Sequence, residues 1–248
     1  MKKNSPTKLS LNPLSLFAET VLVLKNNLSK ILIISAIVAI PGAILRVTSF
    51  DNGVTDFSIV ASLAGLYASL ALLFVFNNPT KLKHTSWTQT YIASSGRFLP
   101  FIGVTIIQGL VGLFVVLGGL LPVIYLAGVV ALPFGLVGAI LCLIAVWLLV
   151  RLSIAGIIVA STDLSVISSV RASWLGTKKR FWVLLLDWFL IFTLVVIGSG
   201  IFLRIAYIVP AIGENMIALA LVNGVLVTIF LPIVLGFGVG IWKRIQAA

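Results

Sequence analysis

Four stretches of this chain run for at least 20 residues without a charged side chain. They cover residues 57–76, 98–121, 123–150 and 216–242. A helix of about 18 apolar residues is already long enough to cross the roughly 30 Å hydrocarbon layer of a membrane. Lipid offers no partner to a backbone N–H or C=O group, so a spanning segment must be a helix or a strand of a closed barrel. The four stretches lack the polar–apolar alternation of barrel strands, and helices are therefore predicted.

The composition excludes an ordinary soluble domain. Apolar residues make up 60% of the 248 residues and charged residues only 9%, whereas soluble domains carry about 25% charged residues. The net charge of +11 invites a nucleic-acid interpretation, but most lysines and arginines lie beside the apolar stretches. That placement is typical of loops facing anionic lipid head groups. We expect the lipid bilayer as the partner, and no nucleic acid.

The predicted fold class is all-α, a polytopic transmembrane bundle of about six spans. The spans are expected at 29–49, 57–76, 98–121, 134–160, 181–203 and 216–242. The fourth has two interpretations, because residues 123–160 carry only Arg151 as a charge and are too long for one span. If Pro122, Gly128 and Pro133 mark a bend, the span covers 134–160. Alternatively it covers 123–150, and Arg151 lies at the membrane surface.

The basic residues are unevenly distributed between the two ends of the predicted spans. One side carries only Arg46 and Arg204. The other side carries Lys2, Lys3, Lys8, Lys25, Lys30, Lys81, Lys83, Arg97, Arg171, Lys178, Lys179, Arg180, Lys243 and Arg244. The positive-inside rule therefore predicts a multi-pass protein of the cell (inner or plasma) membrane with both termini in the cytoplasm.

Three segments on the basic side share one layout: an amphipathic helix, a small or polar break, a basic residue and then two spans. Their apolar faces are formed by Leu14, Phe17, Val21, Leu24 and Leu28, by Trp87, Tyr91 and Phe98, and by Leu164, Ile167, Val170 and Trp174. We predict a single membrane domain of three such units, at about 9–76, 81–160 and 164–244. The amphipathic helices are expected at the head-group level, or packed beneath the bundle to close its inner side.

The third unit carries a more specific pattern between residues 147 and 182. Arg151 is followed by an apolar turn, Asp163, the pair Ser173-Trp174 and the run Arg180-Phe181-Trp182. This progression resembles the glycerophosphoryl diester phosphodiesterase membrane-domain family and related uncharacterised bacterial multi-span families. In some members a soluble domain carries the catalytic residues, and this sequence holds no such domain, so the resemblance implies a multi-span fold and no activity. The basic and aromatic residues expected at the interface are Arg171, Trp174, Lys178, Lys179, Arg180 and Trp182.

Few residues of the sequence are candidates for a catalytic role. The one histidine, His84, stands beside lysines as a loop residue would, and the six acidic residues show no metal-ligand spacing. Gly236, Gly238 and Gly240 lack the strand–helix context of a nucleotide site and are interpreted as a packing face, as are Ala61, Gly65 and Ser69. We expect no enzyme, no metal and no cofactor.

A cluster of polar residues is predicted inside the membrane. Counted from the predicted span ends, Arg151, Asp187 and Gln108 all lie ~10–15 Å deep, and polar groups at such depth are functional candidates. We predict an Arg151–Asp187 ion pair with Gln108 completing its hydrogen bonds, acting as a structural clamp or as a substrate or proton site. The alternative is that Arg151 extends to the inner surface without contact. A fourth polar residue, Asn223, could simply bond a neighbouring carbonyl.

Two functions fit these features. The first is an accessory or membrane-organising role in envelope or lipid homeostasis, and the alternative is a transporter or lipid-handling protein for a small or amphiphilic substrate. The sparse polar lining favours the first over a pathway for a hydrophilic solute. A continuous polar cavity reaching one face would favour the second.

Overall fold

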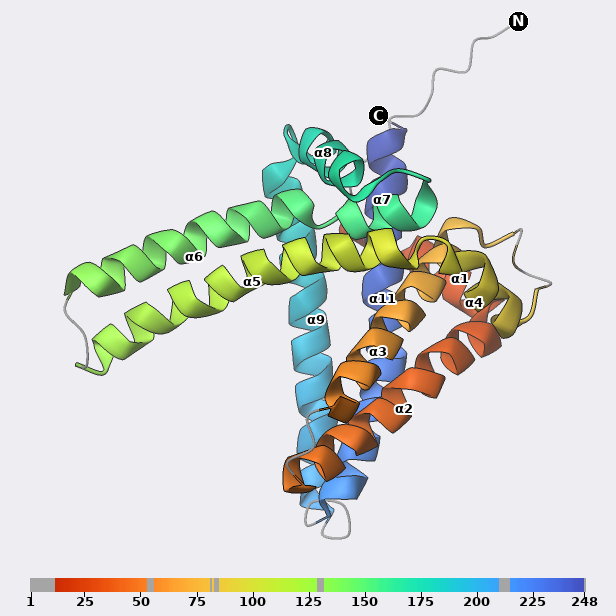
Figure 1. Cartoon of the computed structure of the whole chain (residues 1–248), viewed down its shortest axis with the longest axis horizontal. Helices are drawn as coiled ribbons and strands as arrows, with labels where there is room; N and C mark the ends of the chain where they lie inside the picture. The colour runs from red at the N-terminus through yellow and green to blue at the C-terminus, as the bar shows by residue number, and fades with distance from the viewer. Residues whose placement is uncertain are drawn as a thin grey trace, which may run out of the picture. The chain divides into compact units, whose positions relative to one another are not determined.

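The computed structural model describes residues 12–52, 56–80, 82, 85–128, 132–209 and 215–247. All regular secondary structure in these ranges is α-helical, as Figure 1 shows. In chain order they are α1 (Pro13–Asn26), α2 (Leu28–Asn52), α3 (Asp56–Asn77), α4 (Trp87–Ser95), α5 (Phe98–Leu126), α6 (Leu132–Leu152), α7 (Ala155–Ser161), α8 (Val166–Thr177), α9 (Phe181–Ile208) and α11 (Met216–Gln246). The predicted all-α class is confirmed. His84 and the basic residues Lys2, Lys3, Lys8, Lys81 and Lys83 lie outside the described residues.

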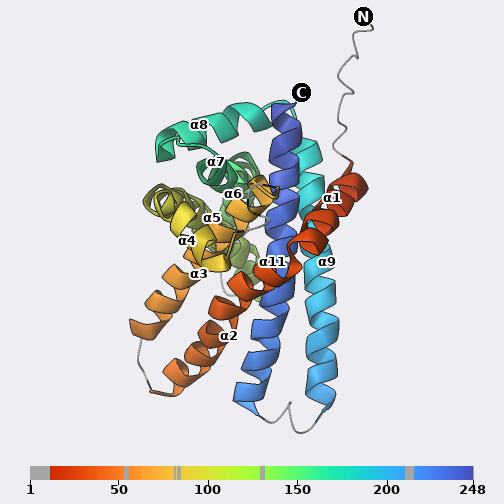
Figure 2. The same cartoon turned by 90° about the vertical axis from the view of Figure 1, so that its right-hand side faces the viewer.

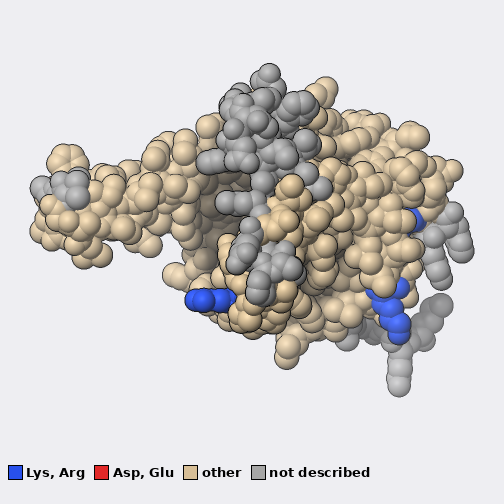
Figure 3. Space-filling view, turned by 90° about the horizontal axis from the view of Figure 1, so that it is seen from below, with Lys and Arg blue, Asp and Glu red and all other residues tan. Residues whose placement is uncertain are grey.

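The long helices have the length and hydropathy of membrane spans. Within the described residues, five qualify: Ile59–Asn77, Phe98–Leu126, Leu132–Ser161, Phe181–Ile208 and Ile217–Gln246. A sixth is counted if α1 and the start of α2, which meet at an angle of 89°, form one broken span. The chain is therefore a polytopic helical membrane protein. On the face that Figure 3 shows, nearly all of the described residues are uncharged.

The fourth span, Leu132–Ser161, agrees closely with the first interpretation of the sequence, 134–160. Helix α5 continues through Pro122 to Leu126, and the turn after it contains Gly128 at a φ of +76°. Within the fourth span the helix is interrupted, because α6 ends at Leu152 and α7 begins at Ala155. Arg151 therefore lies inside the span, in the last turn of α6 before the break. The predicted bend at 122–133 is too long, because a proline is tolerated within a membrane helix when neighbouring groups satisfy the freed carbonyl.

The chain divides into two compact units. The first comprises Met1–Phe98 and Leu186–Ala248, and the second comprises Leu99–Leu185. In the first unit α2, α3 and α11 pack together, with α1 against α11 and α4 against α3. Figure 2 shows α1 turning sharply into α2 where both lie beside α11. In the second unit α8 packs against α6 and α7. Along the chain the order short, long, long recurs, but a single domain of three units stays a prediction.

Glycines on α11 allow two other helices to come close. A Cβ at Gly236 would lie 2.6 Å from atoms of both Thr20 and Phe76, and one at Gly240 would lie 2.9 Å from Leu16. The predicted packing face on α11 is thus confirmed. The face predicted on α3 is looser, because a Cβ at Gly65 would meet only Val38, at 3.9 Å.

The three short helices α1, α4 and α8 turn polar faces inward. Buried hydroxyl residues occur on each of them: Thr20, Thr90, Ser94, Ser169, Ser173 and Thr177. Their apolar residues point outward, with 79% of Leu14, 72% of Ile92 and 79% of Ile167 exposed. A helix on a water-soluble protein shows the opposite arrangement. Small polar residues allow close packing between helices in membranes, and an outward apolar face suits contact with lipid.

Candidate functional site

The side chain of Arg151 is enclosed by two tryptophans in the second unit. Its guanidinium carbon lies 5.3 Å from the ring centroids of both Trp147 and Trp174. The two rings meet edge to face at 5.1 Å. Arg151 Nη1 also donates a hydrogen bond of 3.3 Å to the carbonyl oxygen of Trp174. Such cation–π contacts stabilise a guanidinium that is withdrawn from water.

Helices α6 and α8 cap each other's C-terminal ends around Arg151. The last carbonyls of a helix have no partner within it. Trp174 lies in the last turn of α8, and its carbonyl accepts from the Arg151 side chain. In return, the Arg151 carbonyl near the end of α6 accepts from Ser173 Oγ at 2.7 Å and Thr177 Oγ1 at 3.4 Å. Gln108 Nε2 donates to the Leu152 carbonyl at 2.7 Å.

These hydrogen bonds explain why α6 stops at Leu152. The carbonyls of Arg151 and Leu152 are engaged by side chains from α8 and α5, so the helical hydrogen-bond ladder is interrupted there. The structure brings Arg151 and Gln108 to the same helix end, as predicted from their depth. They meet through the backbone of α6, with no bond between their side chains among the described residues.

Asp187 belongs to the first unit, whereas Arg151 belongs to the second, so their predicted ion pair stays a prediction. Within its own unit, Asp187 is 1% exposed and interacts electrostatically with Arg244. Arg244 is 3% exposed. Its guanidinium donates to Glu19 Oε1 at 2.6 Å and to Ser15 Oγ at 2.8 Å. Arg244 thus joins α1, α9 and α11.

Sequence reasoning missed the Arg244 cluster. The charge distribution identifies Arg244 only as one of the basic residues on one side of the spans. One signal was present, because Glu19 is the single acidic residue between Pro13 and Asn26. An isolated acid on an otherwise apolar and basic segment indicates a cationic partner, although the sequence does not say which one.

Two lysines that contributed to the charge asymmetry also hold the first unit together. Lys243 Nζ donates at 2.9 Å to the carbonyl of Phe76, in the last turn of α3. Lys30 Nζ donates to the carbonyl of Leu82 and, at 3.2 Å, to Thr85 Oγ1. Lys243 satisfies an orphan carbonyl at the C-terminal end of α3 and complements the helix dipole there. The partners of Lys30 lie between α3 and α4 and belong to neither helix. These two cations therefore have partners within the protein.

The predicted interfacial residues separate into two groups. Arg171, Lys178, Lys179 and Trp182 are exposed, as an interfacial role requires. Trp174 is only partly exposed, because its ring and its carbonyl are engaged with Arg151. Arg180 is also partly exposed.

A pair of tyrosines links α2, α3 and α4. Tyr67 Oη donates to the Tyr91 carbonyl at 2.7 Å, and Tyr91 Oη donates to the Ile34 carbonyl at 3.2 Å. Burial, together with the smaller effect of the nearby Tyr67, raises the pKa of Tyr91 to about 12. Tyr91 consequently keeps its proton at neutral pH and remains a donor to α2.

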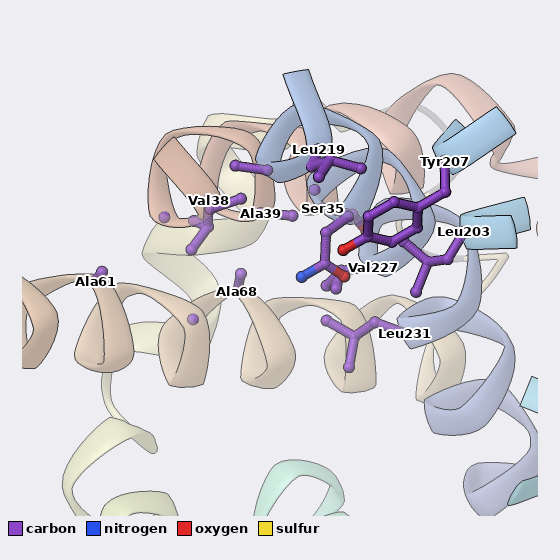
Figure 4. A pocket seen from close by; sticks show the side chains of 16 residues that line it. Ser35, Val38, Ala39, Ala61, Ala68, Leu203, Tyr207, Leu219, Val227 and Leu231 are labelled. Atoms are coloured by element: carbon purple, nitrogen blue, oxygen red, sulfur yellow. The ribbon is translucent and has the colours of Figure 1, made fainter. Parts of the chain in front are cut away.

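A cavity of about 440 Å³ lies between α2, α3, α9 and α11, within the first unit. Figure 4 shows Ser35, Val38 and Ala39 of α2, Ala61 and Ala68 of α3, and Leu203 and Tyr207 of α9 around it. Most of the remaining described wall is glycine, alanine or branched aliphatic, and none of the described lining residues is charged. The polar contributors are Ser35, Asn223 and Tyr207.

The three polar residues of this cavity differ in their bonding. Ser35 Oγ donates to the Ile31 carbonyl at 2.9 Å. For the side chains of Asn223 and Tyr207, no hydrogen bond forms with any residue that the structure describes. The prediction that Asn223 bonds a neighbouring carbonyl is therefore wrong for the described residues. Its side chain is exposed and lines the cavity instead.

Comparison of the chain with protein-family models, with curated proteins and with solved structures found no match. The resemblance of residues 147–182 to the glycerophosphoryl diester phosphodiesterase membrane-domain family thus stays a prediction.

Proposed function

We propose that this protein has an accessory or membrane-organising role, in which α1, α4 and α8 lie in the head-group layer of the cytoplasmic leaflet. The observation that carries the proposal is the arrangement of these three helices, which bury hydroxyl faces and expose apolar ones. A helix in that layer inserts its outward apolar residues into the lipid and keeps its basic residues near the phosphates. The proposal places both termini in the cytoplasm of a cell membrane, and it assigns no catalytic step and no cofactor.

Helix α8 carries the strongest features for lipid contact. Ile167 and Leu175 expose large apolar side chains, and Arg171, Lys178 and Lys179 are exposed basic residues on or directly after the same helix. Unlike Lys30 and Lys243, these three side chains form no hydrogen bond with any residue that the structure describes. They are the cations most available to anionic head groups, each contributing about 1 kcal/mol near a charged membrane surface.

Removing these three charges should abolish a preference for anionic lipid. In vesicles containing brominated phosphatidylglycerol, the tryptophans near α8 should be quenched more strongly than with brominated phosphatidylcholine. The triple variant Arg171→Gln, Lys178→Gln, Lys179→Gln should lose that difference, with about 5-fold weaker anionic-lipid association per removed charge. Arg204→Gln, an exposed arginine of α9, is the control and should keep the preference. An unchanged preference in the triple variant would rule out α8 as an anionic-lipid contact.

One observation, the cavity of the first unit, favours the alternative function of transport or lipid handling. The cavity between α2, α3, α9 and α11 reaches mid-span residues, but its wall is mainly apolar and uncharged. Such a lining offers a hydrophilic solute little compensation for lost water. An amphiphile fits it better, so lipid handling is the form of the alternative that the geometry supports.

A further inference from the structure

The cavity of the first unit lies at a depth that lipid chains occupy. Helix α11 has 31 residues and is therefore ~46 Å long, close to the roughly 40–45 Å of a whole bilayer with its head groups. About 8 Å at each end of α11 then extends beyond the 30 Å hydrocarbon core. Asn223 lies ~10 Å from the start of α11 at Met216, near the edge of the core, and Leu231 lies ~22 Å from it. The cavity therefore runs from the edge of the core toward its middle.

Small residues create the space between the helices. A Cβ at Gly42 would meet only Ala61, and one at Gly65 only Val38, both at 3.9 Å, so α2 and α3 leave room beside each other there. At Gly224 the helices α2 and α11 come close, with Ala39 O and Ile40 Cα only 3.1 Å from a Cβ. The volume of about 440 Å³ falls in the range of roughly 300–1,000 Å³ of small-molecule sites.

The cavity opens to the surface of the first unit. Tyr207, one of its lining residues, is 61% exposed, and Asn223 and Val227 are exposed as well. A surface at this depth faces hydrocarbon and not water. The Asn223 amide and the Tyr207 hydroxyl have no hydrogen-bond partner among the described residues, and a polar group left unpaired in hydrocarbon is costly. A ligand that brings an acceptor to this depth would satisfy both groups.

We propose that this cavity binds one acyl chain of a bilayer phospholipid. The chain fills the space lined by Gly42, Gly65 and Gly224, and its ester carbonyl accepts hydrogen bonds from the Asn223 amide and the Tyr207 hydroxyl. Ester carbonyls lie at the edge of the hydrocarbon core, the depth of Asn223. Among the lining residues that the structure describes there is no lysine, arginine or histidine, so these residues offer no counter-charge to a phosphate or to the carboxylate of a free fatty acid. The site goes beyond the proposed organising role and does not rest on the interfacial helices.

Photo-crosslinking tests this proposal on the full chain in phosphatidylcholine vesicles. The probe is a phosphatidylcholine with a diazirine on one acyl chain, and the labelled peptides are identified by mass spectrometry. Labelling should concentrate on residues 35–43, 61–68 and 220–231. Gly65→Leu places a side chain in the cavity and should reduce labelling there about 10-fold. Gly112→Leu is the matched control, because a Cβ at Gly112 meets nothing within 4 Å and the residue lies outside the cavity, and it should leave labelling unchanged.

Two further comparisons, one with a double variant and one with a second probe, test the proposal even if the Gly65→Leu variant folds poorly. Asn223→Leu together with Tyr207→Phe removes the polar partners without filling the cavity, and should lower labelling by the ester lipid about 5-fold. A diazirine fatty acid, present at the same concentration, should label the three segments more weakly than the ester lipid. Labelling spread evenly over α5 and α6, stronger labelling by the fatty acid, or unchanged labelling in both variants would each overturn the proposal.

Discussion

Arg244→Gln should be the most damaging single charge removal in the described part of the chain, at about 3–5 kcal/mol of unfolding free energy. Arg244 is 3% exposed, and its guanidinium bonds Glu19 and Ser15 and faces the buried carboxyl of Asp187. Without the guanidinium, Asp187 would be a buried charge with no cation beside it, and α1 would lose its link to α11. Thermal unfolding in detergent, followed by circular dichroism, measures the loss.

Two further variants distinguish the effect of the buried Asp187 charge on stability from the effect of the Arg244–Glu19 ion pair. Glu19 is 56% exposed, so Glu19→Gln should cost only about 0–1 kcal/mol. Adding Asp187→Asn to Arg244→Gln should recover part of the loss, because the buried partner then carries no charge. Arg171→Gln on the exposed surface of α8 is the control and should stay within about 0.5 kcal/mol. Equal unfolding temperatures for Arg244→Gln and Arg171→Gln would contradict the role given to Arg244.

Gly118→Ala and Gly112→Ala should have effects of opposite sign, although both change glycine to alanine within α5. A Cβ at Gly118 would lie 2.7 Å from the backbone nitrogen of Cys142 and 2.9 Å from the backbone oxygen of Gly138. Backbone atoms cannot turn aside, so α5 and α6 must separate, which costs about 1–3 kcal/mol or more. At Gly112 a Cβ meets nothing within 4 Å, and alanine should stabilise the helix by about 0.5–1 kcal/mol.

Thermal unfolding in detergent, followed by circular dichroism, also tests the expected effects of the two glycine variants. Gly118→Ala should lower the unfolding temperature of the protein and Gly112→Ala should raise it or leave it unchanged. If both variants shift the temperature in the same direction by the same amount, the close contact of α5 with α6 does not limit the stability of the fold.

The long helices could be predicted from the sequence because hydropathy is a local property. Each of the predicted spans corresponds to an observed long helix, and the three amphipathic segments correspond to α1, α4 and α8. The side of each short helix that faces outward was not predictable. Apolar periodicity alone indicates a two-sided helix, and the same pattern fits burial in a core and exposure to lipid.

The parts that failed depend on residues far apart in the chain. The break after Leu152 follows from hydrogen bonds donated by Gln108 and Ser173, which lie 44 residues away from Leu152 and 22 from Arg151, respectively. The Arg244–Glu19 pair joins residues 225 positions apart. A sequence shows which polar groups need partners, but the partner is selected by packing. Asn223 illustrates this limit, since its place within a span was predicted, whereas its predicted bond to a neighbouring carbonyl is not found among the described residues.

The central claim, that the short helices lie in the head-group layer with their apolar faces in lipid, is tested most directly on α8. Single cysteines at Ile167 and at Lys179, in a Cys142→Ala background, would carry a spin label in proteoliposomes. At Ile167 the label should be relaxed by oxygen, which concentrates in lipid, and protected from a water-soluble nickel chelate. At Lys179, an exposed basic residue two positions past the end of α8, the order should be reversed. A label at Ile167 that the nickel chelate reaches as readily as the one at Lys179 would contradict the claim.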